Sequence, residues 1–175
     1  MLQQHDIAFF TRLPAGGFLL IPSDLLSVFD TYRQINKEDR EAGGLLIGTW
    51  RRPLDFPKRP HIELITCTEP CKTDIRTRYS FERRCKHHID AVEQAWERSG
   101  GVKSYLGEWH THPEEIPRPS SEDTQQWERN LKHKACVVII VGIQQLWVGF
   151  WDGYKATALP KIEQDSQPFL SHDPI

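Results

Sequence analysis

Residues 104–113 read SYLGEWHTHP, and this run has two histidines close to a proline. The segment from Val102 to His110 is typical of a β-strand, in which side chains two positions apart lie on one face of a sheet. His110 and His112 therefore present both imidazoles on the same side. Trp109 alternates to the other face, where we expect it to belong to the core. The stretch predicts a sheet strand that ends in a pair of histidines.

The next polar residues downstream offer a third ligand. Seven residues, three of them prolines, separate His112 from Ser120, and Asp123 follows three positions later. Ser120 lies where a helix N-cap is expected, which places Asp123 in the first helical turn. A stiff loop that folds this turn back over the strand end brings Asp123 beside His110 and His112. Two imidazole nitrogens and a carboxylate suit a tetrahedral Zn²⁺ with an open fourth position. Taken singly, each element has an ordinary interpretation: H-x-H is common, and S-x-x-D is a capping motif.

Upstream, Glu41 precedes the apolar run GGLLIGTW of residues 43–50. This run predicts a buried strand whose glycines permit close approach of a neighbouring backbone or a substrate. An open zinc site needs a base that takes a proton from water and returns it to a leaving amine. Glu41 is the candidate because it immediately precedes this strand, although by itself it is one carboxylate among many.

The rest of the chain alternates between strand and helix patterns. Strands are predicted at 7–11, 18–21, 43–50, 61–66, 102–110, 137–141 and 146–151, and helices at 22–32, 82–99 and 120–132. The pattern predicts an α+β domain with a curved mixed β-sheet flanked by about three helices. Residues 68–80 are expected to form an ordered loop or insertion, and residues 160–175 a C-terminal tail.

The four cysteines do not suggest a metal site. Cys67 and Cys71 lack a second ligand pair at zinc-finger spacing, and in the cytosol we expect thiols to stay reduced. Cys85 falls on an apolar helical stripe with Ile89, Val92 and Trp96, and Cys136 opens an apolar strand, so both are expected to act as small hydrophobes. The adjacent residues 87–88, both histidine, are expected to face solvent.

Composition excludes several functional classes. The chain has 175 residues, enough for one domain, and a formal charge of −2. This balance argues against a general nucleic-acid binder. No apolar run approaches the roughly 20 residues that span a bilayer, and the first residues show no signal-peptide pattern, so a cytoplasmic protein without a membrane partner is expected.

Together, Glu41 before GGLLIG, His110-Thr111-His112-Pro113 and Ser120-x-x-Asp123 resemble the complete JAMM motif of the JAB/MPN zinc metalloproteases. The resemblance implies the JAB/MPN fold, an α/β-type, cytidine-deaminase-like architecture, over residues 1–159. It also implies hydrolysis of a peptide or isopeptide bond at the C-terminus of a ubiquitin-like or conjugated protein. Carried over, His110, His112 and Asp123 bind Zn²⁺, and Glu41 is the general acid/base. Ser120 then hydrogen-bonds the attacking water or the oxyanion.

A narrower resemblance rests on residues 105–114 with Pro119-Ser120 and Trp127. This pattern is similar to compact bacterial JAB proteins encoded beside CBASS anti-phage systems and in integrative elements. Upstream, Asp74, residues 77–78 and residues 81–84 fit the same group. The resemblance implies that the protein removes a cGAS-like nucleotidyltransferase from whatever an E1/E2-like protein joined to its C-terminus. The extended C-terminal tail of that substrate is expected to bind along a sheet edge near residues 68–80.

Several alternatives stay open on the sequence. Glu108 faces the same side as His110 and is either a hydrogen-bonding partner of a metal-binding histidine or a polar residue lining the cleft. Glu108 and Asp74 are the candidates for substrate binding. The long insertions that grip ubiquitin in some eukaryotic JAMM enzymes have no evident room here. The alternative functions are a non-catalytic MPN-like scaffold for partner proteins and a hydrolase of small sulfur-carrier or amino-acid conjugates.

Overall fold

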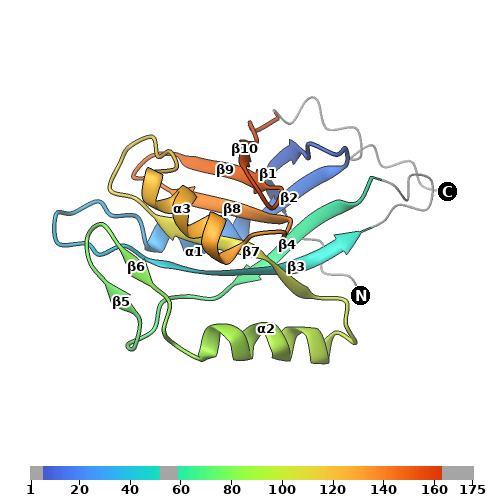
Figure 1. The fold of residues 1–175 in the computed structure, drawn as a ribbon, viewed down its shortest axis with the longest axis horizontal. Coiled ribbons are helices and arrows are strands. Elements are labelled where there is room, and N and C mark those ends of the chain that lie inside the picture. Colours follow the sequence, from blue (N-terminus) through green and yellow to red (C-terminus); the bar gives the residue numbers. More distant parts are fainter. Residues whose placement is uncertain (1–5, 52–58, 163–175) are drawn as a thin grey trace.

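The computed structural model describes residues 6–51 and 59–162 (Figure 1). The strands are β1 (Ile7–Arg12), β2 (Phe18–Pro22), β3 (Gly43–Arg51), β4 (His61–Cys67), β5 (Ile75–Arg76), β6 (Phe81–Glu82), β7 (Ser104–Thr111), β8 (Cys136–Val141), β9 (Leu146–Trp151) and β10 (Ala156–Ala158). The helices are α1 (Ser23–Thr31), α2 (His87–Arg98) and α3 (Ser121–Asn130). Among these described residues, no helix is long and apolar enough to cross a membrane.

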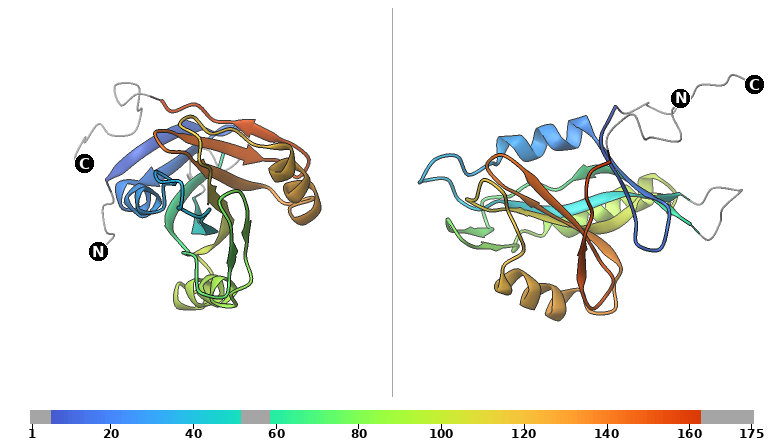
Figure 2. Two further views of the ribbon diagram at one scale, coloured as in Figure 1. Left: turned by 90° about the vertical axis from the view of Figure 1, so that its left-hand side faces the viewer. Right: turned by 90° about the horizontal axis from the view of Figure 1, so that it is seen from above.

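One curved sheet of eight strands organises the molecule, in the order β1-β2-β4-β3-β7-β8-β9-β10. The pairs β2–β4 and β7–β8 are parallel and the other neighbours are antiparallel, so the sheet is mixed. Seen end-on, the sheet bends round like half of a barrel (Figure 2). The α+β class, the curved mixed sheet and the three helices expected from the sequence are confirmed.

Two cores lie on opposite faces of this sheet. Leu25 and Phe29 of α1 pack with Trp109 in the larger core, where Trp109 is 1% exposed, as predicted. Trp127 of α3 packs in the second core with Trp151. Strand β8 is buried on both faces, because alternate residues of this apolar strand enter the two cores. Helix α3 is thereby held against the sheet face opposite to α1.

The central strand β3 approaches its neighbours closely at its glycines. A Cβ atom on Gly44 would lie 1.9 Å from the carbonyl oxygen of Thr68, and one on Gly43 would lie 2.6 Å from the ring of Phe81. Any larger residue would therefore have to displace a backbone or the ring of Phe81. The close backbone approach expected from the GGLLIG run is confirmed.

The prediction for the helix around α2 is wrong in its start and in its buried face. The helix begins at His87, so Cys85 precedes it. Ile89 and Trp96 of the expected stripe are 58% and 55% exposed, whereas His88, expected in solvent, is 1% exposed. The reason is that the first turn of α2 docks through hydrogen bonds of His88 to Thr68 and Asp74, a contact that hydrophobic periodicity does not detect.

The segment between β4 and α2 also differs from expectation. Residues 75–82 form a small hairpin of β5 and β6, apart from the main sheet. Cys71 and Cys85, expected to be independent reduced residues, are joined by a disulfide across its base. Spacing alone does not reveal this pairing, because only the hairpin brings the two ends together. We call residues 71–85 the hairpin insertion.

The chain returns to β1 after the last strand. The hydroxyl of Thr11 donates a hydrogen bond to the carbonyl of Pro160, and the amide of Ile162 donates to the carbonyl of Phe10. The start of the expected tail is thus held on the edge of the sheet. The remainder of the tail, residues 163–175, lies outside the described residues.

Candidate metal centre and active site

Three elements meet at one end of the sheet. Strand β3 begins where β7 ends, and the register pairs Gly43 with His110. Glu41 lies two residues before the start of β3, and His112 immediately follows β7. The first turn of α3 completes the group with Asp123. Residues that are distant in the sequence are therefore held together by strand pairing and by the packing of α3.

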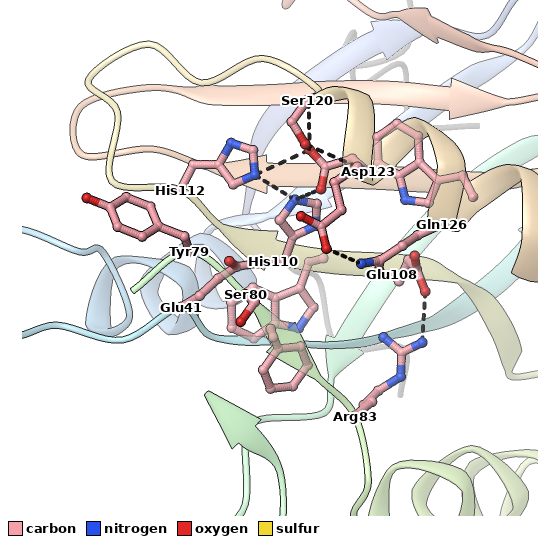
Figure 3. A pocket seen from close by; sticks show the side chains of 14 residues that line it. Glu41, Tyr79, Ser80, Arg83, Glu108, His110, His112, Ser120, Asp123 and Gln126 are labelled. Carbon is pink, nitrogen blue, oxygen red and sulfur yellow. Dashed lines mark hydrogen bonds and ion pairs between the residues drawn. The ribbon is translucent and has the colours of Figure 1, made fainter. Parts of the chain in front are cut away.

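The two histidines and the aspartate converge on one point (Figure 3). Nε2 of His110 lies 3.1 Å from Nε2 of His112 and 3.1 Å from Oδ1 of Asp123. Nε2 of His112 lies 3.4 Å from Oδ2 of Asp123. The three side chains are only 11–13% exposed. The structure thus brings together all three residues that the sequence nominated as metal ligands.

Ser120 and Asp123 form a reciprocal cap at the start of α3. The backbone amide of Asp123 donates to Oγ of Ser120 at 3.1 Å, and the backbone amide of Ser120 donates to Oδ2 of Asp123 at 2.7 Å. The Ser120 hydroxyl also donates to Oδ2 of Asp123 at 2.7 Å. The capping interpretation and the site interpretation of this motif are therefore compatible, because the cap itself orients the carboxylate of Asp123.

Glu41 is held from behind by the hairpin insertion. Its backbone amide donates to the carbonyl of Thr77 at 2.7 Å, and Nε of Arg76 donates to the carbonyl of Glu41 at 2.7 Å. The residue is 6% exposed. Ligand atoms of Glu41, His110 and His112 lie within 4.8 Å of one another. The side chain thus reaches the two imidazoles while its main chain is fixed.

The electrostatics of this group are strongly coupled. Burial raises the pKa of Glu41 to about 7, although the nearby His110 and His112 act to lower it. Burial lowers the pKa of His110, but the hydrogen bond and charge of Asp123 outweigh it, and the net shift is upward. Burial would raise the pKa of Asp123, yet hydrogen bonds from His110, His112 and Ser120 hold it well below its usual range.

These donors fit a divalent metal ion. Two imidazole nitrogens only 3.1 Å apart need a proton or a cation between them. A carboxylate within 3.4 Å of both adds the negative charge that a cation favours. Two histidines and one carboxylate are a known ligand set of catalytic Zn²⁺, in which one position stays open. His110, His112 and Asp123 would hold such an ion, with Glu41 beside it.

The centre lies at the bottom of a pocket between the hairpin insertion and α3. Its wall includes Phe81, which lies in the stretch 81–84 noted in the sequence, and also Tyr79 and Gln126, which the sequence did not single out. Tyr79 is 73% exposed at the rim. No local pattern identifies Tyr79 or Gln126, because they line the pocket only through the positions of the hairpin insertion and of α3.

The two candidates for substrate binding have different locations. Glu108 lies in the pocket wall, where one carboxylate oxygen pairs with Nη2 of Arg83 at 2.9 Å. Asp74 is not among the residues that line the pocket. Its buried carboxylate accepts hydrogen bonds from the amides of Cys71, Arg84 and Cys85. Glu108 therefore faces the space that a substrate would enter, whereas Asp74 holds the base of the hairpin insertion.

A solved structure and two curated proteins are similar to this chain. A solution structure of a protein from Desulfitobacterium hafniense shares the fold, with a TM-score of 0.51 and 20% identity over 81% of this chain and 87% of that one. A Vibrio cholerae protein named CD-NTase/cGAS isopeptidase is 39% identical over 159 residues, or 90% of this chain and 97% of that protein. An Escherichia coli protein of the same name is 34% identical over 132 residues, or 75% and 80% of the two chains.

The family relationship covers the whole candidate site. A family model described as prokaryotic homologs of the JAB domain matches residues 29–152. This range includes Glu41 before β3, the two histidines at the end of β7 and the capped start of α3. The chain therefore belongs to the prokaryotic JAB-domain family.

Proposed function

We propose that this protein is a zinc-dependent isopeptidase of the JAMM type. The observation that carries the proposal is the convergence of His110, His112 and Asp123 within 3.4 Å, with Glu41 beside them. Family membership and two relatives named as isopeptidases support a hydrolase. A scaffold that only binds partners has no need for this set of donors in a pocket.

Each residue of the centre has a distinct task in this proposal. Zn²⁺, when bound, polarises the scissile carbonyl and acidifies water. Glu41 accepts the proton of the attacking water and passes it to the leaving amine. Its main chain is fixed by Thr77 and Arg76, so proton transfer occurs at a defined place. The hydroxyl of Ser120 orients Asp123 and, by rotating, donates to the developing oxyanion.

The substrate we propose is a cGAS-like nucleotidyltransferase conjugated through its C-terminus. The relatives from Vibrio cholerae and Escherichia coli carry names for an isopeptidase acting on such proteins. Removal of the conjugate would reverse E1/E2-like conjugation in CBASS anti-phage defence. We place this activity in a single domain over residues 1–159, followed by a tail, and expect it in the cytoplasm.

The pocket wall suggests how an extended C-terminal tail enters. The hairpin insertion borders one side of the pocket and α3 borders the other. Glu108 and Arg83 pair within this wall and present both charges to the entering chain. We propose that the tail lies between these two walls with its last peptide bond at Glu41.

A cleavage assay with a matched control tests the proposal. The probe is a cGAS-like nucleotidyltransferase whose C-terminus is fused to a fluorescent protein, and the readout is release of that protein. We expect Glu41→Gln to bind Zn²⁺ normally but to lose cleavage by about 100-fold or more. Glu97→Gln, an exposed change on α2, is the control and should cleave like the wild type.

Three outcomes would contradict the proposal in different ways. Cleavage by Glu41→Gln near the wild-type rate would remove Glu41 from the mechanism. Zinc binding by the wild type with no chelator-sensitive cleavage of the fusion would favour a scaffold. Release of small sulfur-carrier or amino-acid conjugates in place of the fusion would favour the third function.

A further inference from the structure

A second group of metal-binding side chains lies at the base of the hairpin insertion. Cys71 and Cys85 are joined by a disulfide, with Cα atoms 6.3 Å apart, and His87 begins α2 two residues later. One ligand atom from each of the three residues lies within 4.8 Å of the others. None of these residues lines the pocket with the JAMM residues. The group is therefore a separate set of donors on another part of the fold.

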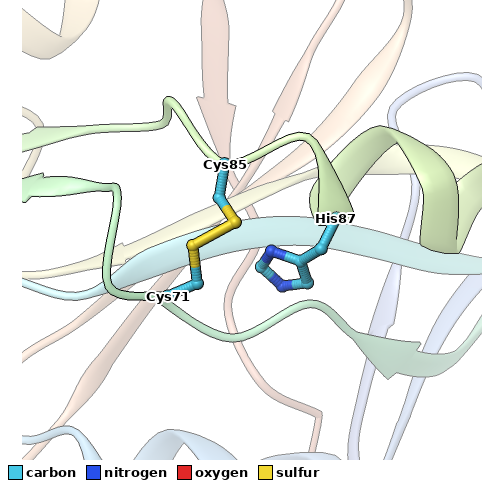
Figure 4. Close-up of side chains that lie close together, drawn as sticks. All are labelled: Cys71, Cys85 and His87. Carbon is cyan, nitrogen blue, oxygen red and sulfur yellow. A yellow bond between two sulfur atoms is a disulfide. The ribbon is translucent and has the colours of Figure 1, made fainter.

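The His87 side chain has an unused nitrogen. Nδ1 of His87 is buried and has no hydrogen-bond partner among the described residues. The imidazole faces the two sulfur atoms (Figure 4). A buried ring nitrogen that makes no hydrogen bond destabilises the folded state. A ligand that this nitrogen binds would remove this destabilisation.

Of the neighbouring polar side chains, Thr73 contacts a sulfur, with its Oγ1 3.2 Å from Sγ of Cys71, whereas His88 and Asp74 bind other groups. His88 is committed to Thr68 and Asp74, and Asp74 is committed to His88 and to three backbone amides. These bonds hold both ends of the hairpin insertion without help from the disulfide. Reduction of the disulfide would thus leave two thiols and an imidazole close together on a fixed backbone.

We propose that Cys71, Cys85 and His87 form a redox-controlled zinc site. Two molecules of a thiol reductant reduce the disulfide to two cysteine thiols and are themselves oxidised to one disulfide, a transfer of two electrons. Zn²⁺ then binds both sulfurs as thiolates and one imidazole nitrogen of His87, which releases two protons. A solvent molecule fills the fourth position. Zn–S bonds of about 2.3 Å in a tetrahedral site require the sulfurs to separate to about 3.8 Å.

The disulfide and the ion exclude each other but link the same chain ends. In either state Cys71 is tied to Cys85, so the hairpin that borders the pocket keeps a closed base. Oxidation would release the ion and reduction would permit its return. The site therefore couples the thiol redox state to metal content, independently of whether the JAMM centre is catalytic.

Cobalt binding tests the site without any measurement of activity. Co²⁺ bound to thiolates gives an intense sulfur-to-metal charge-transfer absorption, which a site of nitrogen and oxygen donors lacks. We expect reduced wild-type protein to bind one Co²⁺ more than the same protein with its disulfide formed, and to show this absorption. Oxidised wild type is the principal control, because it has the same sequence and fold.

Variants assign the absorption to particular residues. Cys71→Ser/Cys85→Ser should lose both the absorption and the additional Co²⁺, and His87→Ala should weaken Co²⁺ binding at least tenfold. Cys67→Ser/Cys136→Ser removes the two free cysteines and should retain the absorption. Equal Co²⁺ binding by oxidised and reduced wild type would overturn the proposal. So would an absorption that survives in Cys71→Ser/Cys85→Ser, or unchanged affinity in His87→Ala.

Discussion

A single hydroxyl group, that of Ser120, connects the cap of α3 with the proposed metal centre. It accepts from the amide of Asp123 and donates to the carboxylate of the same residue. The first contact caps α3, and the second holds Asp123 toward the two histidines. A substitution here therefore affects the helix and the metal centre together.

We predict that Ser120→Ala lowers the free energy of unfolding by about 1 kcal/mol, because the N-terminal amides of α3 lose their cap. The same change should weaken Zn²⁺ binding, since Asp123 loses a donor that orients it. Chemical denaturation and zinc titration measure the two effects. Ser121→Ala, at the exposed neighbouring position, is the control and should change neither quantity appreciably.

At the scale of elements, the hairpin insertion is held to the sheet by a chain of buried polar groups. Thr68 accepts from the amide of Leu45 in β3 at 2.8 Å, and its hydroxyl contacts Nδ1 of His88 at 2.5 Å. Nε2 of His88 lies 3.0 Å from Oδ2 of Asp74. The hairpin in turn fixes the main chain of Glu41. This polar chain thus determines where one wall of the pocket lies.

The charge states in this polar chain predict a pH dependence of stability. Burial lowers the pKa of His88, although its hydrogen bond to Asp74 opposes the shift. The unfolded chain, with a pKa of about 6.5, therefore binds a proton at a pH where folded His88 stays neutral. The contribution of neutral His88 to the free energy of unfolding is therefore complete above about pH 6.5 and declines as the pH falls below that value.

The variant His88→Gln, which removes the titrating group, tests this predicted pH dependence. The wild type should be more stable than His88→Gln by about 1–3 kcal/mol near neutral pH, because the variant leaves buried groups unpaired. The difference should narrow as the pH falls below about 6.5, because the pKa of folded His88 lies below that of the unfolded chain. The titration of Asp74 does not overlap with that of His88. Burial acts to raise the pKa of Asp74, but hydrogen bonds hold this pKa below its usual range. The contribution of ionised Asp74 to stability is therefore lost only below about pH 4. A difference that stays constant as the pH falls below about 6.5 would contradict the assignment.

At the scale of the whole molecule, the proposed metal centre lies where the two halves of the sheet meet. Glu41 precedes β3, the histidines lie at the end of β7, and Asp123 comes from α3 on the other face. These elements meet only in the folded chain. Zinc should therefore bind the native state in strong preference to the unfolded state.

We predict that zinc at about 100 times its dissociation constant stabilises the disulfide-containing protein by about 2.7 kcal/mol. Thermal unfolding at increasing zinc concentration measures this as a rising midpoint. Use of the oxidised protein restricts binding to the JAMM centre. His112→Ala should abolish the shift, whereas the exposed Glu97→Ala should keep it. A shift that persists in His112→Ala would show that the stabilising ion binds elsewhere.

Local signals account for much of this fold and for the centre of its site. The apolar runs at β3, β8 and β9 predict strands because burial on both faces favours uninterrupted hydrophobic residues. The spacing from His110 to Asp123 predicts one ligand set because strand alternation and helix capping are local rules.

The hairpin insertion could not be predicted in the same way. Its strands are two residues long, below the length at which alternation is detectable. The bond between Cys71 and Cys85 and the burial of His88 depend on segments that meet only after folding. Hydrophobic periodicity assigned Ile89 and Trp96 to the core. The assignment was wrong because periodicity carries no information on the polar contacts that orient a helix.

The pairing of Gly43 with His110 also constrains the order of events along the folding pathway. Contacts between residues far apart in the chain form slowly, since a long loop must close first. The proposed zinc ligands converge only after β3 has paired with β7 and α3 has docked. An ion that needs this finished arrangement contributes little to the folding transition state, so it acts mainly by slowing unfolding. An ion bound at the proposed site would therefore extend the lifetime of the native state more than it would assist its formation.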